Sequence, residues 1–333
     1  MTDQAHPCVV VVGAGRMGQG IALAFLSAGM DVTLADVKET DEDRAPYRRA
    51  AEREVLDRLA ARPSPVSGRA PRLTVCGRAA AGERLAGADV VFEAVPEVLE
   101  VKRSVLSWVG AVASGSAVIA STTSTFLVTE LAAPVGDGSR VVNAHWLNPA
   151  DLMPLVEVSR GERTDPGAVS RLTGLLRRIG KVPVVCGPAP GYIVPRLQVL
   201  VMNEAARMVE EGVASAADID RAVRAGFGPR FSVLGPLEFI DWGGGDTLYY
   251  ASRYLAAALG ERFRAPAVIE ENMRSRRRGP QDGTGFYDYT PEDLPAYRAS
   301  RMREFEELLH LRADGLRADA PFPERPAAPP EHG

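Results

Sequence analysis

Short apolar runs alternate with amphipathic stretches through the first half of the chain, and this alternation predicts strands separated by helices. Repeated strand and helix units are typical of an α/β fold with a parallel, doubly wound sheet. The expected strands are Cys8–Val12, Asp31–Ala35, Leu73–Val75, Asp89–Val95, Ala117–Ser121, Val141–His145, Leu155–Val158 and Val182–Cys186. The expected helices lie near Met17–Ala28, Asp43–Ala61, Val98–Val112 and Gly167–Ile179.

The pattern changes after Gly187–Gly191, where long helical stretches such as Val199–Glu211 and Ala216–Ala225 replace the strands. We therefore expect a first domain over residues 1–187 and an all-α C-terminal domain over residues 188–317. The last residues, 318–333, are rich in proline and alanine, a composition that predicts a disordered tail.

The chain has 333 residues, enough for two domains, and a formal net charge of −4. This charge gives no general attraction to nucleic acid or to an anionic membrane, and no apolar run reaches the length of a membrane-spanning helix. A strand is expected within a few residues of Met1, which leaves no room for a signal peptide, so we expect a cytoplasmic protein. The three cysteines lack metal-ligand spacing, and no metal site is expected.

A glycine fingerprint, formed by Gly13, Gly15 and Gly18 with Met17 inside it, follows the first expected strand and opens the first helix. One such glycine makes the tight turn, one admits a pyrophosphate against the backbone, and one packs the helix on the strand. Asp36 ends the second strand, where an acidic side chain meets the adenosine ribose hydroxyls and repels a 2′-phosphate, which favours NAD over NADP. The alternatives are FAD, or a plain βα turn with a solvent-facing aspartate.

Polar residues follow the next two expected strands. Glu97 and Lys102 begin the helix after Asp89–Val95, where they could flank the nicotinamide ribose or remain solvated charges. Ser121–Thr125 closes the following strand, at the edge where sheets of this class bind ligands. A Ser/Thr-rich turn that caps the helix from Phe126 explains the same residues without chemistry, and the sequence alone does not separate the two explanations.

His145 is the only one of the four histidines in the body of the expected fold, at the end of the run Val141–His145. Glu157 lies at the centre of the next apolar run, and a buried histidine and a buried glutamate are expected to pair. Because imidazole side chains titrate near neutral pH, His145 is the first candidate for a general base.

Taken together, these segments resemble the NAD-dependent L-3-hydroxyacyl-CoA dehydrogenase family. The matching pieces are the Gly13 fingerprint, Glu93–Glu97, Ser121–Thr125, His145–Pro149, Leu155–Val158, Pro190–Val194, Leu234–Glu238 and Gly283–Tyr289, which follow in order over nearly the whole chain. The resemblance implies a Rossmann-like NAD-binding domain followed by a helical domain that makes most of the contact in a homodimer.

The resemblance also implies roles for individual residues. It makes His145 the catalytic histidine, Glu157 its partner and Ser124 a substrate-contacting serine, and Asn148 matches the family pattern His-x-x-Asn-Pro. The implied cofactor contacts are Gly13, Gly15, Gly18, Asp36, Glu97 and Lys102, in a segment that includes Met17.

Three features depart from the usual family pattern. Pro195 stands where the family has an asparagine after Pro-Gly-Phe-Ile-Val, and proline offers no side-chain amide. Pro154 stands where acyl-CoA members commonly carry lysine. The stretch Asp41–Arg72 contains arginines but no lysine; Arg48, Arg49, Arg53 and Arg58 could meet CoA phosphates or form a solvated helix face.

The implied function is NAD-dependent oxidation or reduction at the 3-hydroxy group of a 3-hydroxyacyl-CoA, as in fatty acid metabolism. Because of the departures, a free or carrier-protein-bound 3-hydroxy acid remains an alternative substrate, as in the relatives L-gulonate 3-dehydrogenase and carnitine dehydrogenase. A catalytically inactive NAD-binding homologue is a third possibility. The expected partners are a small-molecule substrate and a second copy of the chain, with no nucleic acid and no membrane.

Overall fold

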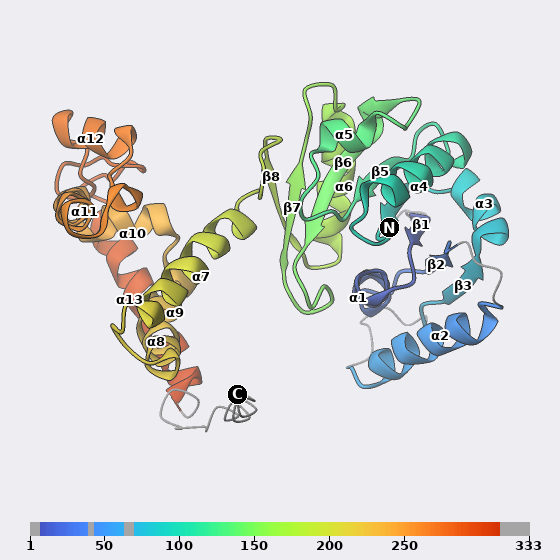
Figure 1. Cartoon of the computed structure of the whole chain (residues 1–333), viewed down its shortest axis with the longest axis horizontal. Helices are drawn as coiled ribbons and strands as arrows, with labels where there is room; N and C mark the ends of the chain where they lie inside the picture. The colour runs from blue at the N-terminus through green and yellow to red at the C-terminus, as the bar shows by residue number, and fades with distance from the viewer. Residues whose placement is uncertain (1–6, 39–42, 63–69, 314–333) are drawn as a thin grey trace, which may run out of the picture. The chain divides into compact units, whose positions relative to one another are not determined.

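The computed structural model describes residues 7–38, 43–62 and 70–313, and the expected tail at 318–333 lies outside them. The chain divides into two compact units, the first ending at Val201 and the second beginning at Met202 (Figure 1). The first unit contains the sheet, and the second is helical. The domain limits 1–187 and 188–317 remain a prediction.

One eight-stranded sheet forms the first unit, in the order β3-β2-β1-β4-β5-β6-β7-β8. The strands are β1 (Val9–Val12), β2 (Val32–Asp36), β3 (Leu73–Gly77), β4 (Val90–Glu93), β5 (Val118–Ser121), β6 (Val141–Trp146), β7 (Leu155–Ser159) and β8 (Val182–Cys186). Neighbouring strands are parallel except β6 and β7, which are antiparallel. The expectation of a parallel sheet is wrong for the pair β6 and β7, because the connection from Trp146 to Leu155 is too short to hold a crossover helix.

Helices cover both faces of this sheet. Val9 and Val11 of β1 belong to one apolar cluster, and Val10 and Val12 belong to another, because successive side chains of a strand point to opposite faces. The first cluster includes residues of α1 (Arg16–Ser27), α2 (Ala45–Ala60) and α6 (Pro166–Arg178), and the second includes residues of α3 (Arg78–Ala86), α4 (Leu99–Val112) and α5 (Val128–Ala132). Burial on both faces explains why the strands read as continuous apolar runs.

Among residues 187–313, helices joined by turns follow β8 and the only β-structure is isolated bridges, as the change of pattern predicts. The α-helices are α7 (Val194–Glu210), α8 (Ala216–Ala222), α9 (Gly228–Val233), α10 (Pro236–Gly243), α11 (Gly245–Leu259), α12 (Ala267–Arg274) and α13 (Leu294–Leu311). Asp241 of α10 is buried and accepts hydrogen bonds from the amides of Phe286 and Tyr287 and from the hydroxyl of Tyr289. This carboxylate ties the segment before α13 to α10.

Candidate active site

The order of the strands reverses at β1, because β2 lies on one side of β1 and β4 lies on the other. Sheets of this class bind ligands outside the carboxyl ends of the strands at such a point. Gly13 leaves β1 with a φ of +117°, and a Cβ there would lie 2.4 Å from the carbonyl oxygen of Ala94. A Cβ at Gly18 would lie 1.8 Å from the carbonyl oxygen of Gly13. Both positions therefore require glycine.

Gly15 serves a different purpose in the same turn. A Cβ at Gly15 would meet nothing within 4 Å, and no side chain caps α1, which begins at Arg16. The backbone is thus open where the positive end of the helix dipole favours an anion. Met17, in the first turn, packs partly buried against the core. These residues fit the pyrophosphate of a dinucleotide.

Asp36 ends β2 and is 5% exposed, so the alternative of a solvent-facing aspartate is wrong. Arg44 donates to both carboxylate oxygens, from Nε at 3.0 Å and from Nη2 at 2.9 Å, and these hydrogen bonds raise the pKa of the guanidinium. Arg48 lies 3.8 Å away. The carboxylate is held at the strand end beside the glycine turn, where the amide of Gly13 donates to the carbonyl of Ala35.

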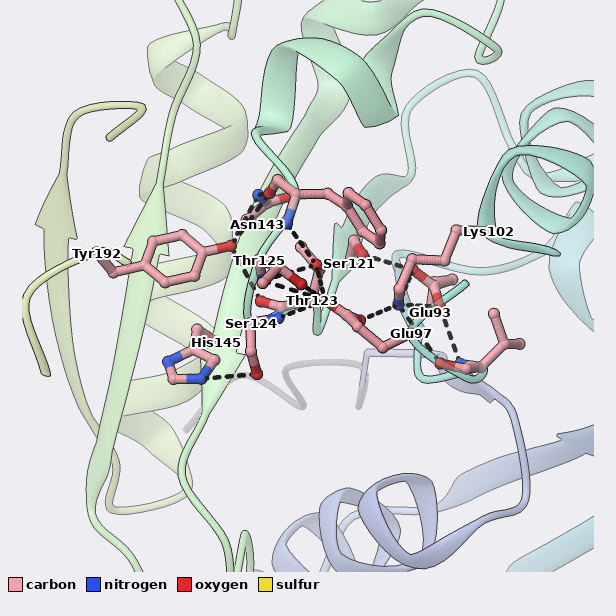
Figure 2. A network of polar contacts seen from close by, with 12 residues as sticks. Glu93, Glu97, Lys102, Ser121, Thr123, Ser124, Thr125, Asn143, His145 and Tyr192 are labelled. Atoms are coloured by element: carbon pink, nitrogen blue, oxygen red, sulfur yellow. Dashed lines mark hydrogen bonds and ion pairs between the residues drawn. The ribbon is translucent and has the colours of Figure 1, made fainter. Parts of the chain in front are cut away.

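Lys102 of α4 is fully buried, so the alternative of a solvated charge is wrong for this residue. Its ammonium lies 3.0 and 3.2 Å from the two oxygens of Glu93 and 3.2 Å from Glu97 (Figure 2). Ser121 also donates to Glu93. A buried charge is tolerated when it is paired and hydrogen-bonded, and two carboxylates provide that environment here.

Glu97 organises the turn after β5 (Figure 2). Its Oε1 accepts hydrogen bonds from the hydroxyls of Thr123 and Thr125 and from the amides of Ser124, at 3.0 Å, and Thr125, at 3.1 Å. Burial works to raise the pKa of Glu97, but the two hydroxyls and Lys102 outweigh burial and keep this pKa below its ordinary value. The carboxylate is therefore ionised at neutral pH and anchors the turn.

Within Ser121–Thr125, Thr123 and Ser124 make different contacts. The Thr123 hydroxyl accepts hydrogen bonds from the amides of Thr125 and Phe126 and so closes the turn. Ser124 instead places its Oγ 3.2 Å from Nε2 of His145 (Figure 2). The turn is structural at Thr123 and faces the candidate base at Ser124.

His145 and Glu157 are directly opposite each other on the antiparallel strands β6 and β7. His145 Nδ1 lies 2.7 Å from Glu157 Oε2, and the two residues are 5% and 0% exposed. The other carboxylate oxygen, Oε1, accepts hydrogen bonds from the amides of Ile193 and Val194, both at 2.8 Å. The backbone at the start of α7 therefore fixes the carboxylate that contacts the imidazole.

The charge of Glu157 determines which nitrogen of the imidazole is basic. Burial works to raise the pKa of Glu157, but hydrogen bonds from His145, Val194 and Ile193 outweigh burial and hold this pKa below its ordinary value. An ionised carboxylate can only accept, so Nδ1 carries the proton and Nε2, which faces Ser124, is the basic nitrogen. The same negative charge stabilises the ring when Nε2 takes up a proton.

Two other positions lie at the edges of this arrangement. Asn148 is exposed in the turn after β6, and the structure does not bring its side chain into hydrogen-bonding contact with His145, Ser124 or Glu157. Pro195 is in the first turn of α7, where a missing amide hydrogen leaves no helical hydrogen bond unmade.

Sequence reasoning missed Tyr192 and Asn143. The ring of Tyr192 stacks on the imidazole of His145, and its hydroxyl contacts the Asn143 side chain and the carbonyl of Thr123. The available signal was a tyrosine in Pro190–Val194, at a position where the family motif has phenylalanine.

A glycine turn that fits a dinucleotide and a histidine–glutamate pair with a basic nitrogen define an NAD-dependent oxidoreductase. In the part of the chain that the structure describes, no group of three His, Cys, Asp or Glu side chains could hold a metal ion. Nor does any helix among those residues have the length and apolar character needed to cross a membrane.

The chain belongs to the 3-hydroxyacyl-CoA dehydrogenase family. Residues 8–189 match the model of the family's NAD binding domain, and residues 191–289 match the model of its C-terminal domain. The family, the fold class and the NAD cofactor predicted from the sequence are thereby confirmed.

Similar proteins have several different names. The chain is 33% identical over 298 residues to 5-formyl-3-hydroxy-2-methylpyridine 4-carboxylate 5-dehydrogenase of Mesorhizobium japonicum, covering 89% of this chain and 95% of that protein. It is also 33% identical to a 3-hydroxybutyryl-CoA dehydrogenase of Bradyrhizobium diazoefficiens, over 84% of this chain and 94% of that protein. Among solved structures, a 3-hydroxyacyl-CoA dehydrogenase of Archaeoglobus fulgidus matches with a TM-score of 0.75 and 33% identity, over 92% of this chain and 99% of that one.

Proposed function

We propose that the protein oxidises the 3-hydroxy group of a 3-hydroxyacyl-CoA, such as 3-hydroxybutyryl-CoA, to the 3-ketoacyl form, with His145 as the general base. The observation that supports this proposal is the geometry of one imidazole. Its Nδ1 is bound by Glu157 at 2.7 Å, and its Nε2 is 3.2 Å from the hydroxyl of Ser124. A basic nitrogen beside a hydroxyl donor is the arrangement that removal of an alcohol proton requires.

The mechanism follows from the roles of these three side chains. Nε2 of His145 accepts the proton of the substrate hydroxyl, and Glu157 stabilises the imidazolium that forms. Ser124 donates a hydrogen bond to the reacting oxygen. Bound NAD supplies the acceptor for the hydride that leaves the same carbon. In the reverse direction, the protonated His145 returns its proton to the ketone oxygen.

The cofactor contacts of individual residues are part of the proposal. Gly13, Gly15 and Gly18 with Met17 form the pyrophosphate turn and Asp36 meets the adenosine ribose, while Glu97 lies nearer the reacting end. Lys102 contributes to this site through its ion pairs with Glu93 and Glu97. Asn148, exposed in the turn after β6, is proposed to contact the substrate.

The test compares two histidine variants with the wild type in NADH formation from 3-hydroxybutyryl-CoA. His145→Ala should lower kcat by about 10²–10⁴-fold while NADH binding persists, since general acid–base catalysis contributes that much. His310→Ala removes an exposed histidine of α13 and should leave both quantities unchanged. Near-wild-type turnover by His145→Ala would refute the proposed base.

A second candidate substrate is a free or carrier-protein-bound 3-hydroxy acid. Pro195 and Pro154 remove groups that acyl-CoA members commonly use, and the relative from Mesorhizobium japonicum is named for a pyridine carboxylate. Among the arginines of α2, Arg58 is paired with Asp151 at 2.8 Å, while Arg49 and Arg53 are exposed.

Substrate arms with 3-hydroxybutyryl-CoA, free 3-hydroxybutyrate and the carrier-loaded acid separate these candidates. Turnover confined to the free acid would exclude a thioester requirement. No turnover in any arm, together with measurable NADH binding, would instead indicate an inactive NAD-binding homologue.

A homodimer completes the proposal. Helix α7 has no fully buried residue, and its exposed apolar side chains are Leu197, Val199, Leu200, Val201, Met202 and Val209. Apolar surface on this scale favours a partner surface, and a second copy of the chain is the partner that the family resemblance implies. Sedimentation equilibrium should give twice the 35.6 kDa mass of the chain, and Leu200→Glu should shift that mass towards the monomer.

A further inference from the structure

Tyr192 lies in the linker between β8 and α7 in an unusual backbone conformation. Its φ is +45°, in the left-handed region that residues other than glycine rarely adopt, and it directly follows Gly191 at +76°. The residue is 6% exposed. A strained conformation persists only where the surroundings determine it, so the contacts of this side chain indicate what the conformation achieves.

The first contact is with the candidate base. The rings of Tyr192 and His145 are stacked, with centroids 5.1 Å apart and an interplanar angle of 16°. Asn143 lies on the same face of β6 as His145, two residues earlier, and its side-chain amide donates to the Tyr192 hydroxyl at 3.0 Å. The tyrosine thus lies over one face of the strand that carries the histidine (Figure 2).

The second contact is with the turn that carries Ser124. The Tyr192 hydroxyl donates to the carbonyl oxygen of Thr123 at 3.0 Å. The amide of Ser124, in the same peptide group, donates to Glu97 at 3.0 Å. The peptide that joins Thr123 to Ser124 is therefore held at both ends. Burial raises the pKa of Tyr192 above its ordinary range, so the hydroxyl keeps the proton that this contact needs.

We infer that Tyr192 is a positioning residue that holds the Ser124 hydroxyl and the His145 ring in register for proton transfer. The inference rests on the proposed function, because it assigns Tyr192 to the same reaction. The tyrosine hydroxyl, which the phenylalanine of the family motif lacks, is the group that joins the strand of the base to the turn of the serine. It acts through Ser124 and His145 and does not itself touch the reacting carbon.

The variant Tyr192→Phe removes this hydroxyl and keeps the ring. Loss of one net hydrogen bond predicts a fall in kcat of about three- to tenfold, with NADH affinity unchanged. With substrate deuterated at C3, the isotope effect on kcat should rise, because the chemical step becomes slower relative to product release. Tyr289→Phe is the matched control, since it removes a hydroxyl that binds Asp241 in the second unit, and it should leave kcat unchanged.

A double-mutant cycle with Ser124→Ala distinguishes positioning from a merely structural role. If the hydroxyl acts through Ser124, Tyr192→Phe should have little further effect on kcat in the Ser124→Ala background. Rates are expressed per NADH-binding site, so that loss of folded protein does not imitate the effect. The probe is 3-hydroxybutyryl-CoA.

Each outcome of this experiment has one meaning. Equal kcat and equal isotope effects for the wild type and Tyr192→Phe refute the inference, and so do independent, additive effects in the cycle. No NADH formation by the wild type refutes the proposed function and the inference with it. A smaller kcat with a larger isotope effect and a non-additive cycle supports both.

Discussion

The variant Glu157→Gln tests the active site most directly, because glutamine keeps the size of glutamate and removes its charge. In the wild type, Oε2 of Glu157 contacts His145 Nδ1, and Oε1 accepts the amides of Ile193 and Val194. A glutamine side chain has one acceptor oxygen and one donor amide. It can therefore satisfy the imidazole or the backbone amides as before, but not both.

The structure indicates which orientation the glutamine adopts. With its oxygen towards Ile193 and Val194, two buried hydrogen bonds remain, and its NH₂ group donates to Nδ1 of His145. The reverse orientation leaves two buried amides facing a donor, at a cost of at least about 2 kcal/mol. The first orientation moves the proton of His145 to Nε2 and is favoured by about thirtyfold. In this tautomer Nε2 cannot accept a proton from substrate.

Loss of charge adds a second effect on the rate. A hydrogen bond from imidazolium to a carboxylate contributes about 1.5–3 kcal/mol, so its absence slows the reaction by a further ten- to hundredfold. The two effects together predict a fall in kcat of about 10³-fold. A carboxylate-to-amide change in the triad of serine proteases costs about 10⁴-fold by the same change of tautomer.

The assay is the initial rate of NADH formation from 3-hydroxybutyryl-CoA, with NADH binding measured separately. NADH affinity should stay close to that of the wild type, because Glu157 does not line the glycine turn. Glu162→Gln, which removes an exposed charge shortly after β7, is the matched control. If kcat of Glu157→Gln stays within about tenfold of the wild type, neither the tautomer nor the charge argument is correct.

Other consequences of the structure can be measured independently. Folding lowers the pKa of Glu157 from 4.5, so the stability that its carboxylate gives to the folded protein is complete above pH 4.5 and is lost as the pH falls through the lower folded pKa. The difference in unfolding free energy between wild type and Glu157→Gln should therefore shrink over that pH range. A difference that stays constant would contradict this prediction. Lys102→Met leaves the buried Glu93 unpaired and should cost about 3–5 kcal/mol in urea unfolding, part of which Glu93→Gln in the same chain should restore. Asp36→Ser releases Arg44 and should lower the ratio of kcat/KM for NAD over NADP by about tenfold or more, whereas an unchanged ratio would exclude Asp36 from cofactor choice.

Much of the first unit could be predicted from the sequence because its signals are local. Strands buried on both faces appear as apolar runs, and Gly18 is fixed by a close contact with the carbonyl of Gly13 in the same turn. The pairing of His145 with Glu157 was also predictable, since consecutive apolar runs usually form neighbouring strands.

The features that the sequence did not reveal depend on contacts between distant segments. Helix α3 was missed because Arg78–Ala86 is short and alanine-rich, and only Ala81 and Leu85 of it are buried. The burial of Lys102 depends on Glu93, which lies on another element, and a lysine near a helix start otherwise reads as solvated. The contact of Tyr192 with Thr123 spans 69 positions, and no periodicity encodes it.

The tolerance of Pro195 follows from the hydrogen bonds around Glu157. The amides of Ile193 and Val194, at the start of α7, donate hydrogen bonds to the Glu157 carboxylate. The next amide of the chain, that of Arg196, donates to the carbonyl of Gly191. Pro195 lies between these donors in the first turn of α7, where proline is common because its missing amide hydrogen leaves no intrahelical hydrogen bond unmade. Proline at this position therefore leaves undisturbed the two backbone hydrogen bonds to the carboxylate that orients His145. On this reasoning, Pro195→Asn should change KM for different substrates more than it changes the kcat of any one of them. A large fall in kcat with unaltered KM would show instead that Pro195 supports the histidine pair.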